Sequence, residues 1–258
     1  MSFLTKKRGL LLIFVVPALL YIGYELFLTR KLSPPADSER ITVSFRVPEG
    51  ITLLPLVGLY TSSECTDTGL TPGGHFDQSE ATTRASLPFV SQGDGNLMSV
   101  SIAKDGGGRC QWKLRSIFVN FKLSDSVALT KGGESLSSGY LFDFIGNTSD
   151  AMYSVGSAQD FKGDLRLDTD FFPVVVNLPD EKTTLRLFGG DVNNYKWSRH
   201  FRLYDTQRIF IKPILHISKS VTVKPSSKLG YFSAVYPDGS SEDIPYIFPD
   251  YEKLLSMK

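Results

Sequence analysis

The stretch Leu97–Leu123, LMSVSIAKDGGGRCQWKLRSIFVNFKL, determines the fold class of this chain. Apolar and polar residues alternate in it, which is the period of a β-strand with one buried face. The turn KDGGG at 104–108 divides the alternation, so the pattern predicts a β-hairpin with strands at 98–102 and 110–114. The alternation then shifts by one position, and we expect a bulge or a turn near Arg115–Ser116.

The same signature recurs on both sides of this stretch. Ile41–Val47 alternates strictly, whereas the apolar run Ile51–Tyr60 is interrupted by Pro55, which is typical of a bulge or a sheet edge. Turn signals separate further apolar segments, which predict strands at 140–145, 171–178, 183–188, 197–204, 208–217, 221–223 and 231–236, and a short helix at 251–257. About ten or more short strands predict an all-β fold, specifically a β-sandwich. Residues 41–258 form either one β domain or two β subdomains divided near residues 124–139.

One long stretch, residues 61–86, lacks the alternation. It is rich in Ser, Thr and Gly and contains Cys65 and the turn TPGG at 71–74. Loops of this length in compact domains are usually either functional or disordered. Because a disulfide at Cys65 would hold one end of the stretch, we expect an ordered surface loop.

An apolar segment near the N-terminus determines the compartment. Gly9–Leu28, GLLLIFVVPALLYIGYELFL, carries a single charge, and as a helix it is about 30 Å long, the thickness of the hydrocarbon core of a bilayer. The alternatives are an uncleaved membrane anchor and a cleaved signal peptide. The apolar run is longer than that of a signal peptide, and no small-residue cleavage site follows it, so we predict a transmembrane anchor.

The residues that flank the anchor predict its orientation. Lys6, Lys7 and Arg8 lie in a short tail, residues 1–8, which the positive-inside rule places in the cytoplasm. Residues 32–40, LSPPADSER, predict an extended linker, because two prolines and mixed charges are unfavourable for a folded element. The β domain at 41–258 is therefore expected on the exported side of the membrane.

Charge and cysteine content agree with export. Residues 1–31 hold five basic residues and one acidic residue, so the net charge of +1 for the 258-residue chain leaves −3 for the rest. This balance gives no basic surface for nucleic acid. Cys65 and Cys110 are the two cysteines, and both follow the anchor, which predicts one disulfide; two unpaired buried thiols are the alternative. On the chain-entropy model, closing a loop of about 46 residues contributes roughly 4 kcal/mol.

A search for catalytic chemistry finds weak candidates. There is no G-x-S-x-G motif, and His75, His200 and His216 are scattered without metal-ligand spacing. The three aspartates of GDLRLDTD are candidates for a calcium loop or for the carboxylate pair of a hydrolase: Asp164, Asp168 and Asp170. We interpret them as solvated loop charges. No catalytic residue, metal or cofactor is predicted, and an acidic β domain of this kind favours a protein-binding module over an enzyme.

One part of the chain is similar to a known group of proteins. The segment YTSSEC, which ends at Cys65, and the strand sequence GGGRCQWKL at 106–114 resemble a family of membrane-anchored envelope proteins of Gram-negative bacteria. The resemblance covers about a fifth of the chain and rests on these positions: Tyr60, Ser62, Cys65, Gly106, Gly107, Gly108, Cys110, Trp112 and Leu114. Its motif is structural, since it implies a disulfide and a buried Trp, so it transfers fold before function.

The resemblance also implies a location and a role. It implies a single-pass protein of the bacterial inner membrane with its C-terminal domain in the periplasm. Some members of the family are associated with immunity against phospholipase effectors of type VI secretion systems. The first hypothesis is therefore a non-catalytic, membrane-anchored module that binds a protein partner, namely a toxic effector that it inhibits. The alternatives are a structural or assembly subunit of an envelope or secretion machine and, third, a carboxylate-dependent envelope hydrolase.

Overall fold

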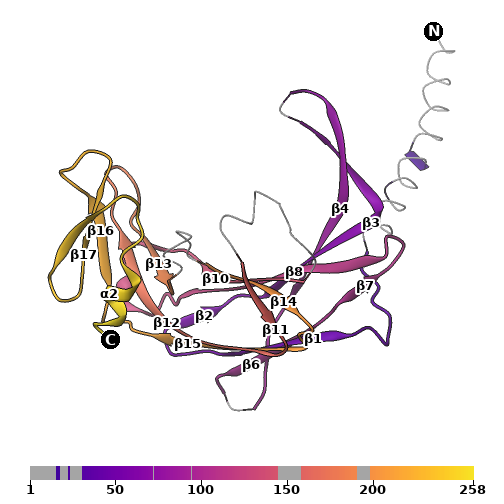
Figure 1. Cartoon of the computed structure of the whole chain (residues 1–258), viewed down its shortest axis with the longest axis horizontal. Coiled ribbons are helices and arrows are strands. Elements are labelled where there is room, and N and C mark those ends of the chain that lie inside the picture. The colour runs from indigo at the N-terminus through magenta and orange to yellow at the C-terminus, as the bar shows by residue number, and fades with distance from the viewer. Residues whose placement is uncertain are drawn as a thin grey trace, which may run out of the picture. The chain divides into compact units, whose positions relative to one another are not determined.

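The computed structural model describes residues 16–17, 23, 31–71, 73–93, 95–144, 158–190 and 198–258 (Figure 1). Within them the chain is nearly all β, with 57% of residues in strands and one short α-helix for which both ends are described. Two sheets pack together, which is consistent with a β-sandwich. Apart from Val16, Pro17 and Gly23, the predicted anchor at 9–28 lies outside the described residues. No helix within the described part is long and apolar enough to cross a membrane.

The strands in chain order are β1 (Arg40–Arg46), β2 (Ile51–Leu53), β3 (Leu56–Leu70), β4 (Phe76–Leu87), β5 (Val90–Ser91), β6 (Leu97–Ala103), β7 (Asp105–Gly107), β8 (Trp112–Leu123), β9 (Glu134–Ser135), β10 (Ser138–Asp143), β11 (Gln159–Lys162), β12 (Leu165–Val176), β13 (Thr184–Phe188), β14 (Ser198–Tyr204), β15 (Arg208–Leu215), β16 (Val221–Pro225), β17 (Phe232–Val235) and β18 (Ser241–Ile244). A 3₁₀ turn, η1 (Ala128–Thr130), precedes β9, and helix α2 (Tyr251–Leu255) follows β18.

The described strands form two mixed sheets. In one sheet the path runs β18-β17-β16-β12-β15-β1-β6-β5, and in the other it runs β11-β14-β10-β8-β3-β4. Several neighbours are parallel, among them β1 and β15, β12 and β15, and β10 and β14. Parallel neighbours require long connections, so segments far apart in the sequence lie side by side here.

The chain divides into two compact units. The first comprises residues 1–39, 60–83 and 103–114, and the second comprises 40–59, 84–102 and 115–258. The division predicted near 124–139 differs from this one, since that segment lies inside the second unit and contains η1 and β9.

Aromatic side chains fill the space between the sheets in the second unit. The ring of Phe121 on β8 lies 5.3 Å from that of Phe45 on β1 and 5.1 Å from that of Phe171 on β12, between ring centroids. All three side chains are at most 1% exposed. Burial of one such ring stabilises the fold by roughly 1.5–3 kcal/mol, so this contact between the sheets is a principal source of stability.

A second core lies at the C-terminal end of the same unit, where β12, β13, β16, β17 and β18 surround Leu254 of helix α2. Asp250 caps the helix, since its side chain accepts a hydrogen bond from the backbone N–H of Lys253. The hydroxyl of Tyr251 donates to the backbone carbonyl of Asp170 at 2.8 Å and so attaches the helix to β12. The predicted helix at 251–257 is thus confirmed over its first five residues.

Two predictions about local structure are wrong. The segments predicted to pair as a hairpin, 98–102 and 110–114, lie in different sheets, because β6 pairs with β5 and β8 pairs with the glycine-rich β7. The predicted loop at 61–86 is instead most of a long hairpin, β3 and β4. The residues of this hairpin are largely exposed on both faces. Ser and Thr therefore occupy the positions on both faces, and the strands show no alternation of apolar and polar residues.

No turn interrupts the chain near Arg115–Ser116, where a bulge or a turn was predicted. Strand β8 continues without interruption from Trp112 to Leu123. The buried residues change from even to odd positions at Ser116 and Ile117, and the strand passes from the first unit to the second between Leu114 and Arg115. The buried residues of β8 thus belong to the first unit up to Leu114 and to the second unit from Ser116 onward.

Candidate functional site

The residues that carry the sequence motif assemble in the first unit. Cys65 on β3 and Cys110, which precedes β8, form the predicted disulfide, with Cα atoms 5.4 Å apart. The Ser62 hydroxyl donates to the carbonyl of Cys110 at 2.5 Å and accepts from the N–H of Cys65 at 3.0 Å. The Tyr60 hydroxyl donates to the carbonyl of Ala103 at 2.7 Å. Both hydroxyls are buried, so the segment YTSSEC is fixed by covalent and polar contacts.

The three consecutive glycines of the motif form a close contact with the segment that follows the predicted anchor. A Cβ on Gly106 would lie 2.8 Å from side-chain atoms of both Leu32 and Tyr60 and 2.9 Å from Cβ of Trp112, which is 0% exposed. A Cβ on Gly107 would overlap the carbonyl oxygen of Ser33. Glycine is required here because the neighbouring backbone occupies the space of a side chain.

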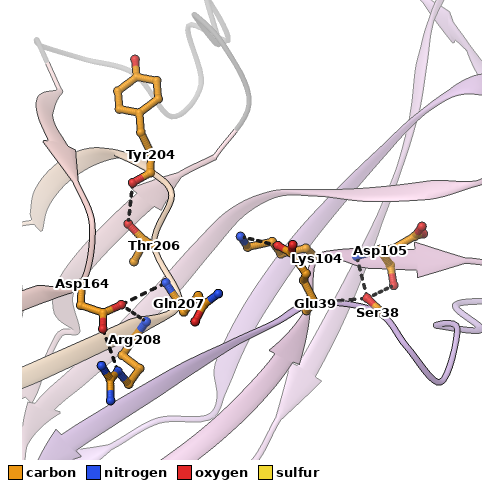
Figure 2. Close-up of polar contacts among 9 residues, drawn as sticks. All are labelled: Ser38, Glu39, Lys104, Asp105, Asp164, Tyr204, Thr206, Gln207 and Arg208. Carbon is orange, nitrogen blue, oxygen red and sulfur yellow. Dashed lines mark hydrogen bonds and ion pairs between the residues drawn. The ribbon is translucent and has the colours of Figure 1, made fainter.

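Backbone and side-chain hydrogen bonds complete this contact. The N–H of Ser33 donates to the carbonyl of Gly106 at 2.8 Å, and Ser33 and Gly107 form a parallel bridge. The Ser38 hydroxyl donates to the carbonyl of Asp105 at 3.2 Å and accepts from its N–H at 3.1 Å (Figure 2). We call residues 31–39 the post-anchor segment. It differs from the extended linker predicted over residues 32–40, because it contains a turn, in which the N–H of Ser38 donates to the carbonyl of Pro35 at 3.1 Å, and it is attached to β7.

Two ion pairs flank the contact. Lys104 Nζ lies 3.0 Å from Glu39 Oε2, and Lys113 Nζ lies 2.7 Å from Asp105 Oδ2. The hydrogen bond from Lys113, with a further one from the N–H of Gly107, lowers the pKa of Asp105 below its ordinary value. The carboxylate is therefore ionised at neutral pH. It orders the glycine turn because it accepts a hydrogen bond from the N–H of Gly107 at 2.8 Å.

The hairpin extends beyond the disulfide as an exposed structure, which we call the hairpin arm (residues 61–83). Thr71 and His75 close its turn, since the N–H of Thr71 donates to the carbonyl of His75 at 2.8 Å. Leu70 and Phe76 flank the turn, and they are 67% and 80% exposed. Paired large apolar residues at the exposed end of a polar hairpin are unfavourable in water and are typical of an interaction site.

The three candidate aspartates are not brought together as a catalytic pair. Asp164 accepts hydrogen bonds from Gln207 N at 3.2 Å and from Arg208 N at 2.8 Å, and it pairs with Arg208 Nε at 2.7 Å (Figure 2). Asp168 pairs with Arg166 at 3.0 Å. The loop prediction is wrong for Asp168, which lies in strand β12 (Leu165–Val176), whereas Asp164 lies in the bend that directly precedes this strand. The two carboxylates hold neighbouring chain segments.

Asp170 is part of a different cluster, which holds the C-terminus. Its carboxylate lies 2.6 Å from His216 Nε2 and 3.0 Å from Lys258 Nζ. Burial acts to raise the pKa of Asp170, but the hydrogen bonds from His216 and Lys258 outweigh it, and the pKa is lowered. Burial raises the pKa of Tyr251 to about 12, so its hydroxyl remains a donor to the Asp170 carbonyl. This arrangement fixes helix α2 against β12.

A buried polar cluster that the sequence did not reveal lies on three adjacent strands of the second unit. Asp143 on β10 accepts a hydrogen bond from Ser116 Oγ at 2.6 Å, and His200 Nε2 lies 2.5 Å from its other oxygen. All three residues are 4–6% exposed. The carboxylate lies between the hydroxyl and the imidazole, whereas nucleophilic catalysis requires the imidazole in the middle. The cluster therefore fits a structural role better than hydrolysis.

No metal cluster is formed by His, Cys, Asp or Glu among the described residues. A hollow of about 540 Å³ in the second unit is lined by apolar residues that include Val127, Leu215 and Ile217, with Glu49 as its one ionisable side chain. An active site usually combines an apolar pocket with several convergent polar groups. This hollow does not offer them.

Comparison of the chain with models of protein families, with curated protein sequences and with solved structures finds no match. The functional interpretation therefore depends on the sequence and on the geometry described above.

Proposed function

We propose that this chain is a non-catalytic protein, tethered to the membrane by residues 9–28, that binds a protein partner through the hairpin arm. The observation that carries the proposal is the exposure of Leu70 and Phe76, at 67% and 80%, at the end of an arm whose base is covalently fixed. Large apolar side chains in this setting are typical binding anchors.

The fixed base supports this role. An isolated two-stranded hairpin is marginally stable in water. Here the disulfide at Cys65 and the buried hydroxyl of Ser62 hold the arm where it begins. A binding element that is ordered before the partner arrives loses less conformational entropy on binding, and this increases affinity.

The post-anchor segment supports a location close to the membrane. Residues 31–39 begin two residues after the proposed anchor and belong to the same compact unit as the arm. Because Ser33 and Ser38 are hydrogen-bonded to β7, only a few residues separate the membrane from this unit. A partner of the arm would therefore be met near the membrane surface.

A specific form of this function is immunity against a toxic effector, as the sequence resemblance implies. An inhibitor anchored in the inner membrane, with its β domain in the periplasm, would meet a phospholipase before the enzyme reaches the lipids. The separate partners of Asp164, Asp168 and Asp170 support a non-catalytic role, because a carboxylate-dependent hydrolase needs two of them at one site.

The immunity form is tested by co-expression with periplasm-directed candidate phospholipase toxins. We expect cells that carry the chain to survive one such toxin, and cells with the double variant Leu70→Ser/Phe76→Ser to be killed. Leu229→Ser is the control, since Leu229 is 98% exposed in the second unit. Survival that is the same with and without the chain would eliminate immunity. If the double variant protects cells as well as the wild type does, the hairpin arm is not the binding element.

A further inference from the structure

The hairpin arm carries an unusual edge for a β protein. The described sheet paths end at four strands, and three of these are short: β5 has 2 residues, while β11 and β18 have 4 each. The fourth, β4, has 12 residues, and the first five are exposed. A long exposed end strand offers unpaired backbone groups, and proteins usually shorten or cover such edges.

The charge of the arm is one-sided. Between residues 61 and 83 there are four acidic residues, Glu64, Asp67, Asp77 and Glu80, and no Lys or Arg. Asp77 and Glu80 are both exposed on β4. No Lys or Arg in the described part of the chain forms an ion pair with Glu64, Asp77 or Glu80. The arm thus presents Asp77 and Glu80 on the same strand that presents the open edge, and Arg84, the basic residue of β4, lies just outside the arm.

From these two observations we infer that β4 of the arm receives a basic strand of a partner protein, which extends the sheet by one strand. Backbone hydrogen bonds along β4 supply general affinity in this mode of recognition, and the side chains supply selectivity. Lysine or arginine side chains of the added strand pair with Asp77 and Glu80, and an apolar residue packs on Phe76. This inference rests on the proposed function, for which it specifies the chemistry of the partner.

The same charge argues against two other occupants. A second copy of this chain paired along β4 would bring another Asp77 and Glu80 to the first pair, and like charges on facing strands are destabilising. An anionic bilayer would repel the arm, because interfacial segments that bind such membranes carry Lys and Arg beside their apolar residues. A basic strand of another protein would pair both with the open backbone groups of β4 and with the carboxylates of the arm.

The test uses the full chain in detergent micelles and, as the probe, a fluorescein-labelled octapeptide with the repeat Lys-Lys-Val-Val, which places both residue types on each face of the added strand. We expect fluorescence anisotropy to show binding that weakens as salt is added, and hydrogen exchange of residues 76–83 to slow when the peptide is bound. Asp77→Asn/Glu80→Gln should bind about tenfold more weakly, because two charge pairs are lost. The matched control Asp125→Asn/Glu181→Gln removes two exposed carboxylates from the second unit and should bind as the wild type does.

The contrary outcomes are distinct. Equal affinity for the arm variant and the control, or equal binding of a glutamate–valine octapeptide, overturns the inference. So does strong quenching of Phe76→Trp in vesicles of equal parts phosphatidylethanolamine and brominated phosphatidylglycerol, since that result assigns the arm to the membrane. A partner cross-linked at position 76 whose binding is insensitive to Asp77→Asn/Glu80→Gln would also overturn it, while leaving protein binding by the arm intact.

Discussion

At the scale of single residues, Gly107 determines how the post-anchor segment is held. Its φ of +55° is unfavourable for other residues, and a Cβ there would overlap the carbonyl of Ser33. We expect Gly107→Ala to lower the free energy of unfolding by about 1–3 kcal/mol and to release residues 31–39. Urea unfolding measures the first effect, and hydrogen exchange at the Ser33 amide measures the second.

Gly74 provides the matched control for this variant. Its φ of +77° is similarly strained for alanine, but nothing lies within 4 Å of the position of its Cβ. Gly74→Ala should therefore lower the free energy of unfolding through backbone strain alone, without faster hydrogen exchange at the Ser33 amide. If both variants leave Ser33 equally protected, the close approach at Gly107 does not hold the segment.

Asp170 gives the fold a dependence on acidity. The pKa of its carboxyl is lower in the folded chain than its ordinary value of 3.8, because hydrogen bonds from His216 and Lys258 outweigh the effect of burial. The resulting stabilisation is present above the unfolded-state pKa and is lost as the pH falls through the lower folded-state pKa.

This linkage predicts the behaviour of Asp170→Asn. The difference in unfolding free energy between the wild type and the variant should be largest at neutral pH and should shrink in strong acid. Urea unfolding across the acidic range measures it, with Asp125→Asn as the control because that side chain is 88% exposed. A difference that does not change with pH would show that the charge of Asp170 makes no contribution.

At the scale of elements, the disulfide fixes the base of the hairpin arm. It links residues separated by 45 positions, and on the chain-entropy model such a closure contributes about 4 kcal/mol. We expect Cys65→Ser/Cys110→Ser to lose up to this amount of unfolding free energy and to become sensitive to proteolysis within residues 61–83. An arm that stays as resistant as in the wild type would contradict the role of the disulfide.

The sequence predicted those elements whose two faces have different surroundings. β1 and β15 are marked by alternating burial, because one face of each packs in the core and the other meets solvent. The arm has no such contrast, so its strands read as a polar loop. The sequence predicted one hairpin from segments that lie in β6 and β8, which belong to different sheets. Alternation of apolar and polar residues shows which side chains share a face, but it does not show which strand is the neighbour.

The candidate site was predictable only in part, for a related reason. Cys65, Cys110 and Trp112 stand out by residue type, and the structure brings them together as expected. The cluster of Asp143 and His200 joins residues 57 positions apart across a parallel pair of strands, and no local pattern marks that pairing. Exposure at the end of the arm likewise follows from the tertiary structure, since Leu70 and Phe76 resemble core residues in the sequence.

At the scale of the whole molecule, the proposal places the two ends of the anchor in different compartments. Leu229→Cys, at a position that is 98% exposed in the second unit, should react with a membrane-impermeant maleimide added to cells with a permeabilised outer membrane. Ser2→Cys should react only after the inner membrane is dissolved. Labelling in the reverse order would contradict the orientation, and release of the chain into the soluble periplasmic fraction would contradict the anchor.

Photo-cross-linking in living cells tests whether the hairpin arm is where this protein meets its proposed partner. A benzoylphenylalanine at position 76, at the end of the arm, is compared with one at position 229, which is also exposed but lies in the second unit. We expect a discrete cross-linked protein at position 76 that is absent at position 229. No adduct at position 76, or the same adduct at both positions, would contradict it.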